Sequence, residues 1–469
     1  MRIYIKNLGE YIDQEVLVNG WVDVRRDQGK MVFLDLRDVT GKVQAVCLPF
    51  HTEALTVAQQ LRTEWVVSVK AKVNKRPEKN IKADVANGDI ELEVLSIEVL
   101  NEADTPAFDI STDGYEVGEE VRLGKKYLDL RRARLQHNLR TRHKVIKYIR
   151  DYFDANNFIE IETPLLTTPT PEGSRSYLVP ARLYPGSFYA LPQSPQQYKQ
   201  LLMTAGFERY FQVAKCMRDE DTRGDRQPEF TQLDLEMSFV TREDVMKINE
   251  DILIKIVTEF FPEKKIQSIP FPILTHKEAM EKYGSDKPDI RTDKNDSNLL
   301  AFCWVIDFPF FEATGADNVD DTGEWTFTHN PFSKPQDKCM NDLMEKKNIG
   351  SILTTQYDVA LNGYEIGGGS IRNHNPIALR RVFEVMGYSD ERINSNFGHM
   401  LEALASGTPP HGGIAWGLDR LLMVLLNEPN IREVIAFPKT GEGKDLLMQS
   451  PAVATPKNLR ELNLEIKKK

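Results

Sequence analysis

The chain has 469 residues, of which 41% are hydrophobic and 28% charged, and its formal net charge is −10 at pH 7. This length suffices for two or three domains, and the composition is ordinary for a soluble globular protein. The negative charge argues against a protein that coats nucleic acid over its whole surface, but it leaves room for local basic patches. Four scattered cysteines form no CxxC pair, which argues against a zinc site or a disulfide framework. Because the sequence has no long apolar run and no signal-like start, we expect a cytoplasmic protein without a membrane partner.

The first 104 residues consist of short strand-like segments separated by turns, with one helical segment near 53–61. Five strands at this spacing predict an OB-fold barrel. In the second strand the alternating aliphatic residues take the core face, which leaves Phe33 pointing outward. An outward ring can stack unpaired bases, although a singly exposed aromatic residue needs no such explanation. The expected strands cover residues 16–22, 31–36, 42–48, 65–73 and 89–95.

Residues 105–130 begin with Thr-Pro-Ala-Phe and continue with spaced glycines, which predicts a hinge. Between Arg122 and Arg150 there are eleven Lys or Arg residues and a single acid, Asp129. Such a run could lie along nucleic-acid phosphates, and a solvated helix face is the alternative. Apolar residues at helical spacing predict a helix over 137–156.

The most informative stretch, residues 209–239, predicts a β-hairpin with a long charged tip. In its second arm, polar and apolar residues alternate from Gln232 to Phe239, which is typical of a strand with one face in water. Phe230 falls on that polar face, and Arg218 lies on the polar face of the first arm. Arginine forks onto phosphate oxygens and an aromatic face stacks a base, so the hairpin suits a nucleotide. A solvated hairpin with paired charges is the alternative.

A second hairpin, residues 357–366, turns at an Asn-Gly dipeptide. This turn pairs Ala360 with Glu365, which makes Asp358 the diagonal neighbour of Glu365 on the same face. Two neighbouring carboxylates repel each other unless they share a cation, and their oxygens suit Mg²⁺. The pair therefore predicts a magnesium site, with two exposed acids as the alternative.

The order of residues around these hairpins resembles a known family. Arg-x-Glu, a charged loop and Pro-Glu-Phe-Thr-Gln-x-Asp-x-Glu, over residues 218–236, resemble motif 2 of the class II aminoacyl-tRNA synthetases, in the aspartyl, asparaginyl and lysyl subgroup. Residues 137–164 resemble motif 1, and residues 409–426 resemble motif 3. Gln-Ser-Pro-Gln-x-x-Lys at 193–199 and Gly-Gly-Gly-Ser-x-Arg at 367–372 are similar to segments of the bacterial aspartyl enzymes.

The resemblance implies an α+β fold with three parts: an OB-fold anticodon-binding domain at 1–104, the hinge at 105–130, and a class II catalytic domain at 131–469, built on an antiparallel sheet flanked by helices. A domain that the bacterial aspartyl enzymes usually insert after about residue 291 is missing from this sequence. The implied activity is that of an aspartate–tRNA ligase, which uses ATP and Mg²⁺ and has L-aspartate and tRNA(Asp) as partners. Motif 1 builds the dimer interface of the family, so a homodimer is also implied.

The same resemblance assigns roles to single residues. Arg218 and Arg420 would be catalytic, the first at the α-phosphate and the second at the γ-phosphate of ATP, while Asp358 and Glu365 would hold the metal. The other implied ATP contacts are Glu220, Gln227, Phe230, Glu365 and Gly417; the implied aspartate contacts are Glu172, Ser194, Gln196, Lys199, Gln232, Asp234, His329 and Arg372; and the implied anticodon contacts are Arg25, Arg26, Phe33, Gln44 and Glu91.

Two positions bear on how far the resemblance reaches. Asn330 stands where the family's His-His-Pro-Phe segment carries its second histidine, so a pH-dependent role there is not implied. Gln28 does not decide whether tRNA(Asn) is also charged. An asparaginyl enzyme and a non-catalytic tRNA-binding paralogue remain alternatives. Lys199 with Arg372 favours a carboxylate over an amide as substrate, and the intact ATP-site residues argue against a paralogue.

Overall fold

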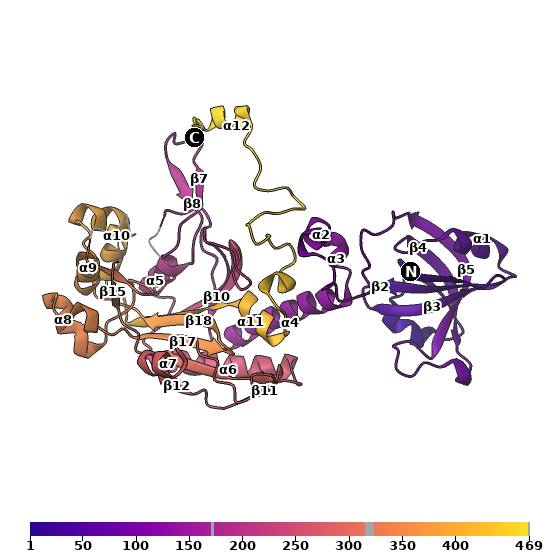
Figure 1. Ribbon diagram of the computed structural model, residues 1–469, viewed down its shortest axis with the longest axis horizontal. Helices are drawn as coiled ribbons and strands as arrows, with labels where there is room; N and C mark the ends of the chain where they lie inside the picture. Colours follow the sequence, from indigo (N-terminus) through magenta and orange to yellow (C-terminus); the bar gives the residue numbers. More distant parts are fainter. Residues whose placement is uncertain (170–172, 315–322, 468–469) are drawn as a thin grey trace. The chain divides into compact units, whose positions relative to one another are not determined.

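The computed structural model describes residues 1–169, 173–314 and 323–467. By its internal contacts the chain divides into two units, Met1–Gly114 and Tyr115–Lys469, which we call the barrel unit and the sheet unit. A β-sheet is the framework of each (Figure 1). This arrangement confirms the predicted combination of an OB-fold barrel with an α+β domain. No helix in the described ranges has both the length and the apolar character that crossing a bilayer requires.

The barrel unit is a sheet closed on itself, with helices and turns between the strands (Figure 1). Its elements are η1 (Ile5–Tyr11), β1 (Glu15–Asp27), β2 (Val32–Asp38), β3 (Gly41–Cys47), α1 (Thr52–Gln60), β4 (Val66–Lys75), η2 (Glu78–Asn80) and β5 (Ile90–Asn101). The strand order is β1-β2-β3-β5-β4. Buried and half-exposed residues alternate along β2 because successive side chains point to opposite faces, and Leu34 and Leu36 fill the interior.

The sheet unit is organised around eight hydrogen-bonded strands. They are β6 (Ile159–Glu160), β9 (Arg209–Met217), β10 (Glu229–Ser238), β12 (Ile273–Thr275), β14 (Phe302–Ile306), β17 (Gln356–Leu361), β18 (Tyr364–Ile371) and β19 (His411–Gly417). Their order is β12-β14-β17-β18-β19-β10-β9-β6, and only the two outermost pairs are parallel. The short pairs outside this sheet are β7 (Leu178–Pro180) with β8 (Phe188–Ala190), β11 (Lys265–Ile266) with β13 (Leu299–Leu300), and β15 (Phe311–Ala313) with β16 (Trp325–Phe327).

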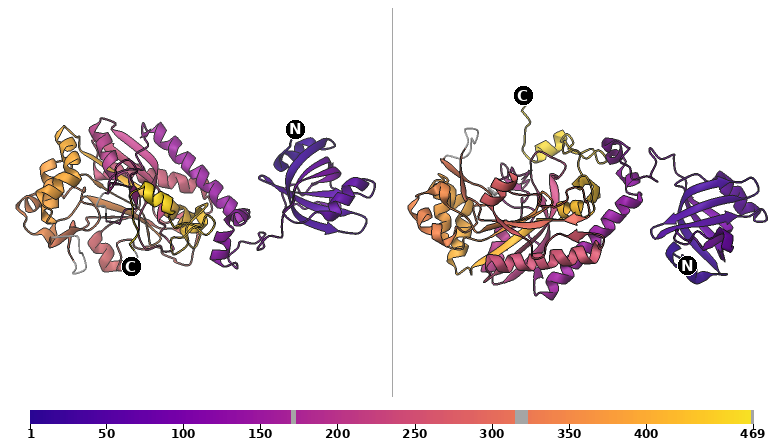
Figure 2. Two further views of the ribbon diagram at one scale, coloured as in Figure 1. Left: turned by 90° about the horizontal axis from the view of Figure 1, so that it is seen from above. Right: turned by 60° about the horizontal axis from the view of Figure 1, so that its bottom comes forward.

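Helices supply the rest of the core of the sheet unit. They are α2 (Glu119–Gly124), α3 (Lys126–Asp129), α4 (Ala133–Ala155), α5 (Gln196–Thr204), α6 (Arg242–Phe260), α7 (His276–Tyr283), α8 (Met340–Glu345), α9 (Pro376–Val385), α10 (Asp390–Ala405), α11 (Leu418–Leu425) and α12 (Pro456–Glu461), with the 3-10 turns η3 (Asp337–Cys339), η4 (Ile349–Ser351) and η5 (Ile431–Val434). Helices α4 and α6 lie side by side (Figures 1 and 2). Ile149 of α4 and Ile252 of α6 share one apolar cluster with Leu233 and Leu235 of β10. One face of β10 therefore packs against helices, as its alternating pattern predicts.

The other face of β10 differs from the prediction. The hairpin and its polar alternation are present, but the face predicted to lie in water is buried: Asp234 and Glu236 are both 0% exposed. Helix α5 and the residue that follows β18 supply cations that pair with these carboxylates, which compensates their desolvation. Phe239, predicted on the apolar face, lies beyond the end of β10 with a φ of 59° and is exposed.

The first part of the basic stretch after residue 122 differs from both interpretations of it, whereas the basic residues from Lys144 to Arg150 on α4 are exposed, as both interpretations predict. Arg122, Lys126 and Arg132 are buried and pair with Asp129, so they neither line a nucleic-acid surface nor form a solvated face. Within the stretch predicted as a hinge, the division between the units falls after Gly114, and α2 and α3 belong to the sheet unit.

Candidate active site

A cavity of about 370 Å³ opens over the polar face of the large sheet. The β9–β10 hairpin, the β17–β18 hairpin, α5 and the start of α11 contribute to its walls. Glu172, one of the predicted aspartate contacts, lies outside the described residues. All the other residues predicted to bind ATP, aspartate or metal line this one cavity: Ser194, Gln196, Lys199, Arg218, Glu220, Gln227, Phe230, Gln232, Asp234, His329, Asp358, Glu365, Arg372, Gly417 and Arg420.

Three residues that line the cavity, Lys199, Asp234 and Arg372, form a buried network with Glu236. Lys199 Nζ lies 2.5 Å from Asp234 Oδ1 and 3.2 Å from Glu236 Oε2. Arg372 donates to both oxygens of Glu236, at 2.8 Å from Nε and 3.1 Å from Nη2. Burial favours the neutral form of Glu236, but Arg372 and Lys199 outweigh it and hold the pKa of this carboxyl below its usual value. The network therefore keeps charged groups in place without water around them.

Glu236 was missed as a functional candidate by the sequence analysis. The alternation in β10 assigned it to a solvated face, whereas it joins the two predicted substrate cations, Lys199 and Arg372. No signal within the strand could have revealed this role, because both partners come from distant elements.

Some polar atoms in this part of the cavity lack a protein partner. Among the described residues, the buried atoms Asp234 Oδ2 and Gln196 Nε2 make no hydrogen bond. Burial raises the pKa of Asp234, and the charge of Lys199 opposes that shift. A buried acceptor and a buried donor without partners destabilise the fold unless a ligand forms hydrogen bonds with them. A ligand with both an ammonium group and a carboxylate would do so.

The outer part of the cavity presents arginines and an aromatic ring. The guanidinium carbon of Arg218 lies 5.1 Å from the centre of the Phe230 ring. Arg420 donates from Nη1 to the Glu365 carbonyl at 2.5 Å, and its Nη2 lies 3.1 Å from Asp225 Oδ2. In the described part of the chain, the Nε atoms of both arginines have no hydrogen-bond partner. Cations with free donors beside a ring can hold phosphate oxygens and a base.

Two predicted ATP contacts already have protein partners. Glu220 accepts hydrogen bonds from the Ser174 hydroxyl and, at 3.2 Å, from Arg226 Nη1. Gln227 accepts from the Lys439 backbone N–H at 2.8 Å through its Oε1. These side chains line the cavity, but in this structure they also fix neighbouring segments.

The paired carboxylates lie on β17 and β18. Ala360 pairs with Glu365 as predicted, and a bulge after Val359 then places Asp358 opposite Gly368. A Cβ atom at position 368 would lie 2.7 Å from Asp358 Oδ1, so this close approach requires glycine. Burial, with the nearby charge of Glu365, raises the pKa of Asp358 well above its usual value.

The donor set of this pair fits one kind of cation. Within the described ranges, no group of three or more His, Cys, Asp or Glu residues could hold a metal ion. A site with only two carboxylates suits an ion that takes its other ligands from water and substrate phosphates, as Mg²⁺ does. A cation there would also relieve the repulsion that raises the pKa of Asp358.

His329 and its neighbour Asn330 both line the cavity. The His329 ring packs edge-on against Phe308 with ring centres 4.7 Å apart, and burial lowers the pKa of His329. Asn330 Oδ1 accepts from the Phe332 N–H at 2.8 Å, so its side chain holds a local turn.

In the barrel unit, the predicted anticodon contacts are only partly brought together. The strand register places Arg26 opposite Phe33 and Gln44 opposite Asp35, on the outer face of the barrel. Arg26 forms a two-pronged ion pair with Asp35, both distances being 2.8 Å. Glu91 precedes Leu92, which pairs with Ala45, so the register of β3 and β5 also places Glu91 beside Gln44, and its carboxylate lies 4.0 Å from Arg76 Nε. Arg25 differs, because it lies opposite the core residue Leu34 and donates to the Gln59 carbonyl.

Two family models match the chain. Residues 16–100 match the OB-fold nucleic acid binding domain, and residues 118–441 match the tRNA synthetases class II (D, K and N), which is well over half of the chain. The chain belongs to the class II tRNA synthetases. This assignment confirms the family predicted from the three sequence motifs.

Individual class II tRNA synthetases align over nearly the whole chain. An aspartate–tRNA ligase from Listeria welshimeri is 39% identical over 593 aligned positions, which cover 99% of this chain and 98% of that protein. An aspartate–tRNA(Asp/Asn) ligase from Thermoanaerobacter pseudethanolicus is 38% identical and covers 97% of this chain and 96% of its own length. The crystal structure of asparaginyl-tRNA synthetase from Pyrococcus horikoshii complexed with asparaginyl-adenylate has a TM-score of 0.75 at 22% identity, covering 94% of this chain and 98% of that chain. At this identity the likeness concerns the fold alone.

Proposed function

We propose that the chain is an aspartate–tRNA ligase: it activates L-aspartate with ATP to aspartyl-adenylate and then transfers the aspartyl group to the 3′ end of tRNA(Asp). The observation that carries this proposal is the single cavity that joins a buried Lys199–Arg372 pair to an outer wall of arginines and Phe230. The relatives from Listeria welshimeri and Thermoanaerobacter pseudethanolicus, both aspartate–tRNA ligases by name, support it.

In the first step, the residues of the cavity bind and orient the substrates. The aspartate side-chain carboxylate lies between Lys199 and Arg372, and its ammonium group donates to Asp234 Oδ2. The aspartate α-carboxylate oxygen then attacks the α-phosphorus of ATP, a phosphorus–oxygen bond forms, and the bond to pyrophosphate breaks. Arg218 stabilises the charge on the α-phosphate and Arg420 holds the leaving pyrophosphate. No protein nucleophile is needed, because positioning and charge stabilisation lower the barrier.

Asp358 and Glu365 are the residues that would hold Mg²⁺. When bound, the ion neutralises charge on the phosphates of ATP. The raised pKa of Asp358 beside Glu365 supports a cation at this position. Phe230 stacks the adenine, with Glu220 and Gln227 as polar neighbours.

We further propose that the barrel unit reads the anticodon through Phe33, Gln44 and Arg26, with Arg25 and Glu91 at its margin. The region of α4 and β6, which resembles motif 1, forms the interface of a homodimer, and the protein acts in the cytoplasm. The catalytic domain lacks an insertion after about residue 291. The alignment with the Listeria welshimeri enzyme has 593 positions, more than the 469 residues of this chain, so that relative contains residues that this chain lacks.

ATP–pyrophosphate exchange in the presence of each amino acid tests this proposal. We expect exchange that depends on L-aspartate and is not supported by L-asparagine, since a neutral amide cannot form ion pairs with Lys199 and Arg372. Exchange with asparagine alone would contradict the proposal. A second candidate, a non-discriminating enzyme that also charges tRNA(Asn), is favoured by the relatives named aspartate–tRNA(Asp/Asn) ligases.

A further inference from the structure

The tip of the β9–β10 hairpin, residues 218–229, forms much of the outer cavity wall. Hydrogen bonds from the turn η5 hold this tip in place. The Ile431 N–H donates to the Gly224 carbonyl at 3.0 Å, and the Ile431 side chain itself lines the cavity. Arg432 Nη1 donates to the Arg223 carbonyl at 3.5 Å. The turn η5 therefore touches both the back of the tip and the cavity.

Further contacts of the tip come from the same part of the chain, in addition to those that Ser174 and Arg175 make with Glu220 and Asp219. Asp225 pairs with Arg420 at the start of α11. Further along, the Lys439 N–H donates to Gln227, and the Thr222 hydroxyl donates to the Gly441 carbonyl. A charged loop that lines a ligand site is thus braced by the segment from α11 to residue 441.

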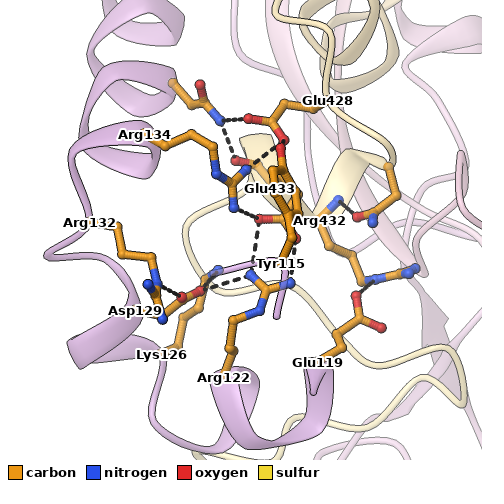
Figure 3. Close-up of polar contacts among 12 residues, drawn as sticks. Tyr115, Glu119, Arg122, Lys126, Asp129, Arg132, Arg134, Glu428, Arg432 and Glu433 are labelled. Carbon is orange, nitrogen blue, oxygen red and sulfur yellow. Dashed lines mark hydrogen bonds and ion pairs between the residues drawn. The ribbon is translucent and has the colours of Figure 1, made fainter. Parts of the chain in front are cut away.

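A buried ionic network fixes the turn η5 (Figure 3). Glu433 is 2% exposed and accepts from Arg122 at 2.8 and 3.2 Å and from Arg134 Nη2 at 2.9 Å. Arg134 also pairs with Glu428, at 2.6 Å. The neighbouring Arg432 donates to Glu119 at 2.5 Å. Figure 3 shows that these side chains come from α2, the start of α4 and the segment after α11, and that they point toward one another.

We propose that Glu433 is a positioning residue for ATP. Glu433 holds η5 against α2 and α4, η5 holds the hairpin tip through Ile431 and Arg432, and the tip sets the position of Arg218 and Phe230 relative to the nucleotide. This role rests on the proposed function of the cavity, since it names a residue that acts on the same substrate without touching it. It predicts that loss of Glu433 raises the KM for ATP more than the KM for aspartate. The reason is that Lys199 and Arg372, in the aspartate pocket, are held by their own ion pairs with Asp234 and Glu236.

The electrostatics of Glu433 suit a fixed anchor. Burial alone would raise the pKa of Glu433, but the hydrogen bond and charge of Arg122, together with Lys126 and Arg134, lower it to about 2. The carboxylate is therefore ionised at every pH at which the enzyme would work. Replacing it by an amide keeps its size and removes the charge that compensates two buried guanidinium groups.

The test compares Glu433→Gln with Glu64→Gln in aspartate-dependent ATP–pyrophosphate exchange. Glu64 is a matched control, because it is equally buried at 2% exposure and is also held by an arginine, with both oxygens 2.8 Å from Arg37 Nη2, but it lies in the barrel unit. We expect E433Q to raise the KM for ATP about tenfold with the KM for aspartate unchanged, and E64Q to change neither. Exchange is measured below the unfolding midpoint of each variant, which a melting curve gives.

Several outcomes would overturn the proposal. A folded E433Q with the wild-type KM for ATP would contradict it, and so would equal rises for ATP and aspartate, which indicate general damage. If E433Q does not fold, Arg432→Ala provides the second variant, because Arg432 is only partly buried; it must show the same ATP-specific rise. Calorimetry of ATP binding in the presence of Mg²⁺ separates this proposal from the proposed function. If the wild-type chain shows no ATP–pyrophosphate exchange, the proposed function is refuted. The positioning role is still supported in that case if E433Q binds ATP more weakly than the wild-type chain does.

Discussion

The barrel unit and the sheet unit place their candidate functional residues in opposite ways. The barrel is filled by one large apolar cluster and presents Phe33 and Gln44 on its outer face, where the Arg26–Asp35 pair is partly accessible to solvent. The sheet unit buries Lys199, Glu236 and Arg372 at 2% exposure or less. A surface that reads a flexible polymer tolerates water around its charges, whereas a cavity that selects one small carboxylate needs charges fixed out of water. The two kinds of site should therefore respond very differently to mutation.

The largest effect is expected at the reacting phosphate. Arg218→Ala removes the cation that stabilises the α-phosphate, and we expect aspartate-dependent ATP–pyrophosphate exchange to fall by about a thousandfold. Binding of tRNA, followed by filter retention, should persist because the barrel unit is unchanged. Undiminished exchange would remove Arg218 from the mechanism.

The next effect compares a buried ion pair with an exposed one. Glu236→Gln leaves Lys199 and Arg372 undercompensated, and we expect it to lower the free energy of unfolding by about 3–5 kcal/mol. Asp35→Asn removes only an exposed partner of Arg26, so its cost should stay below about 1 kcal/mol. Urea unfolding of both variants measures these losses in the free energy of unfolding. Equal losses would contradict the claim that the ion pair of the sheet unit matters more to stability than that of the barrel unit.

A pH series tests the anchor Glu433. Its folded pKa of about 2 lies below its ordinary value of 4.5, so the stabilisation it provides is complete above the unfolded pKa and is lost as pH falls from about 5 toward 2. At pH 7 we expect the free energy of unfolding of E433Q to be about 3 kcal/mol lower than that of the wild type. This difference in the free energy of unfolding should become smaller as the pH falls. If the difference in the free energy of unfolding stays constant between pH 7 and pH 3, the charge of Glu433 is not what stabilises the fold.

The smallest effect is expected on the barrel surface. Phe33→Ala removes a stacking platform, which should weaken tRNA charging by about tenfold through KM for tRNA. Adenylate formation should remain near its wild-type rate, because Phe33 is not one of the residues that line the cavity. Charging and exchange assays on the same preparation decide this, and a parallel loss of both activities would argue against a separate anticodon unit.

The comparison also explains how much the sequence could predict. Strand periodicity predicted the barrel and the outward Phe33, because in a small closed sheet one face is core and the other is solvent. The same periodicity misplaced Glu236, since it reports polarity and not whether another element covers the polar face. Only the tertiary fold brings Lys199 and Arg372 over β10.

Residue order succeeded where periodicity failed. The family motifs brought together the residues of the cavity, although they are separated by more than two hundred positions along the chain. They could not predict that Arg122 is buried and Arg134 half-buried, because a run of basic residues has the same composition whether it faces solvent or a buried acid. They also gave no indication of Glu433, whose carboxylate accepts from side chains of α2 and α4.

The measurement that tests the central claim most directly is charging of two tRNA transcripts, one with an aspartate and one with an asparagine anticodon, by the purified protein with labelled aspartate or labelled asparagine. We predict that aspartate is attached to the transcript with the aspartate anticodon. Aspartate on both transcripts would identify a non-discriminating enzyme with the same carboxylate pocket. Attachment of asparagine alone, or of neither amino acid, would contradict the assignment of Lys199 and Arg372 to the aspartate side chain.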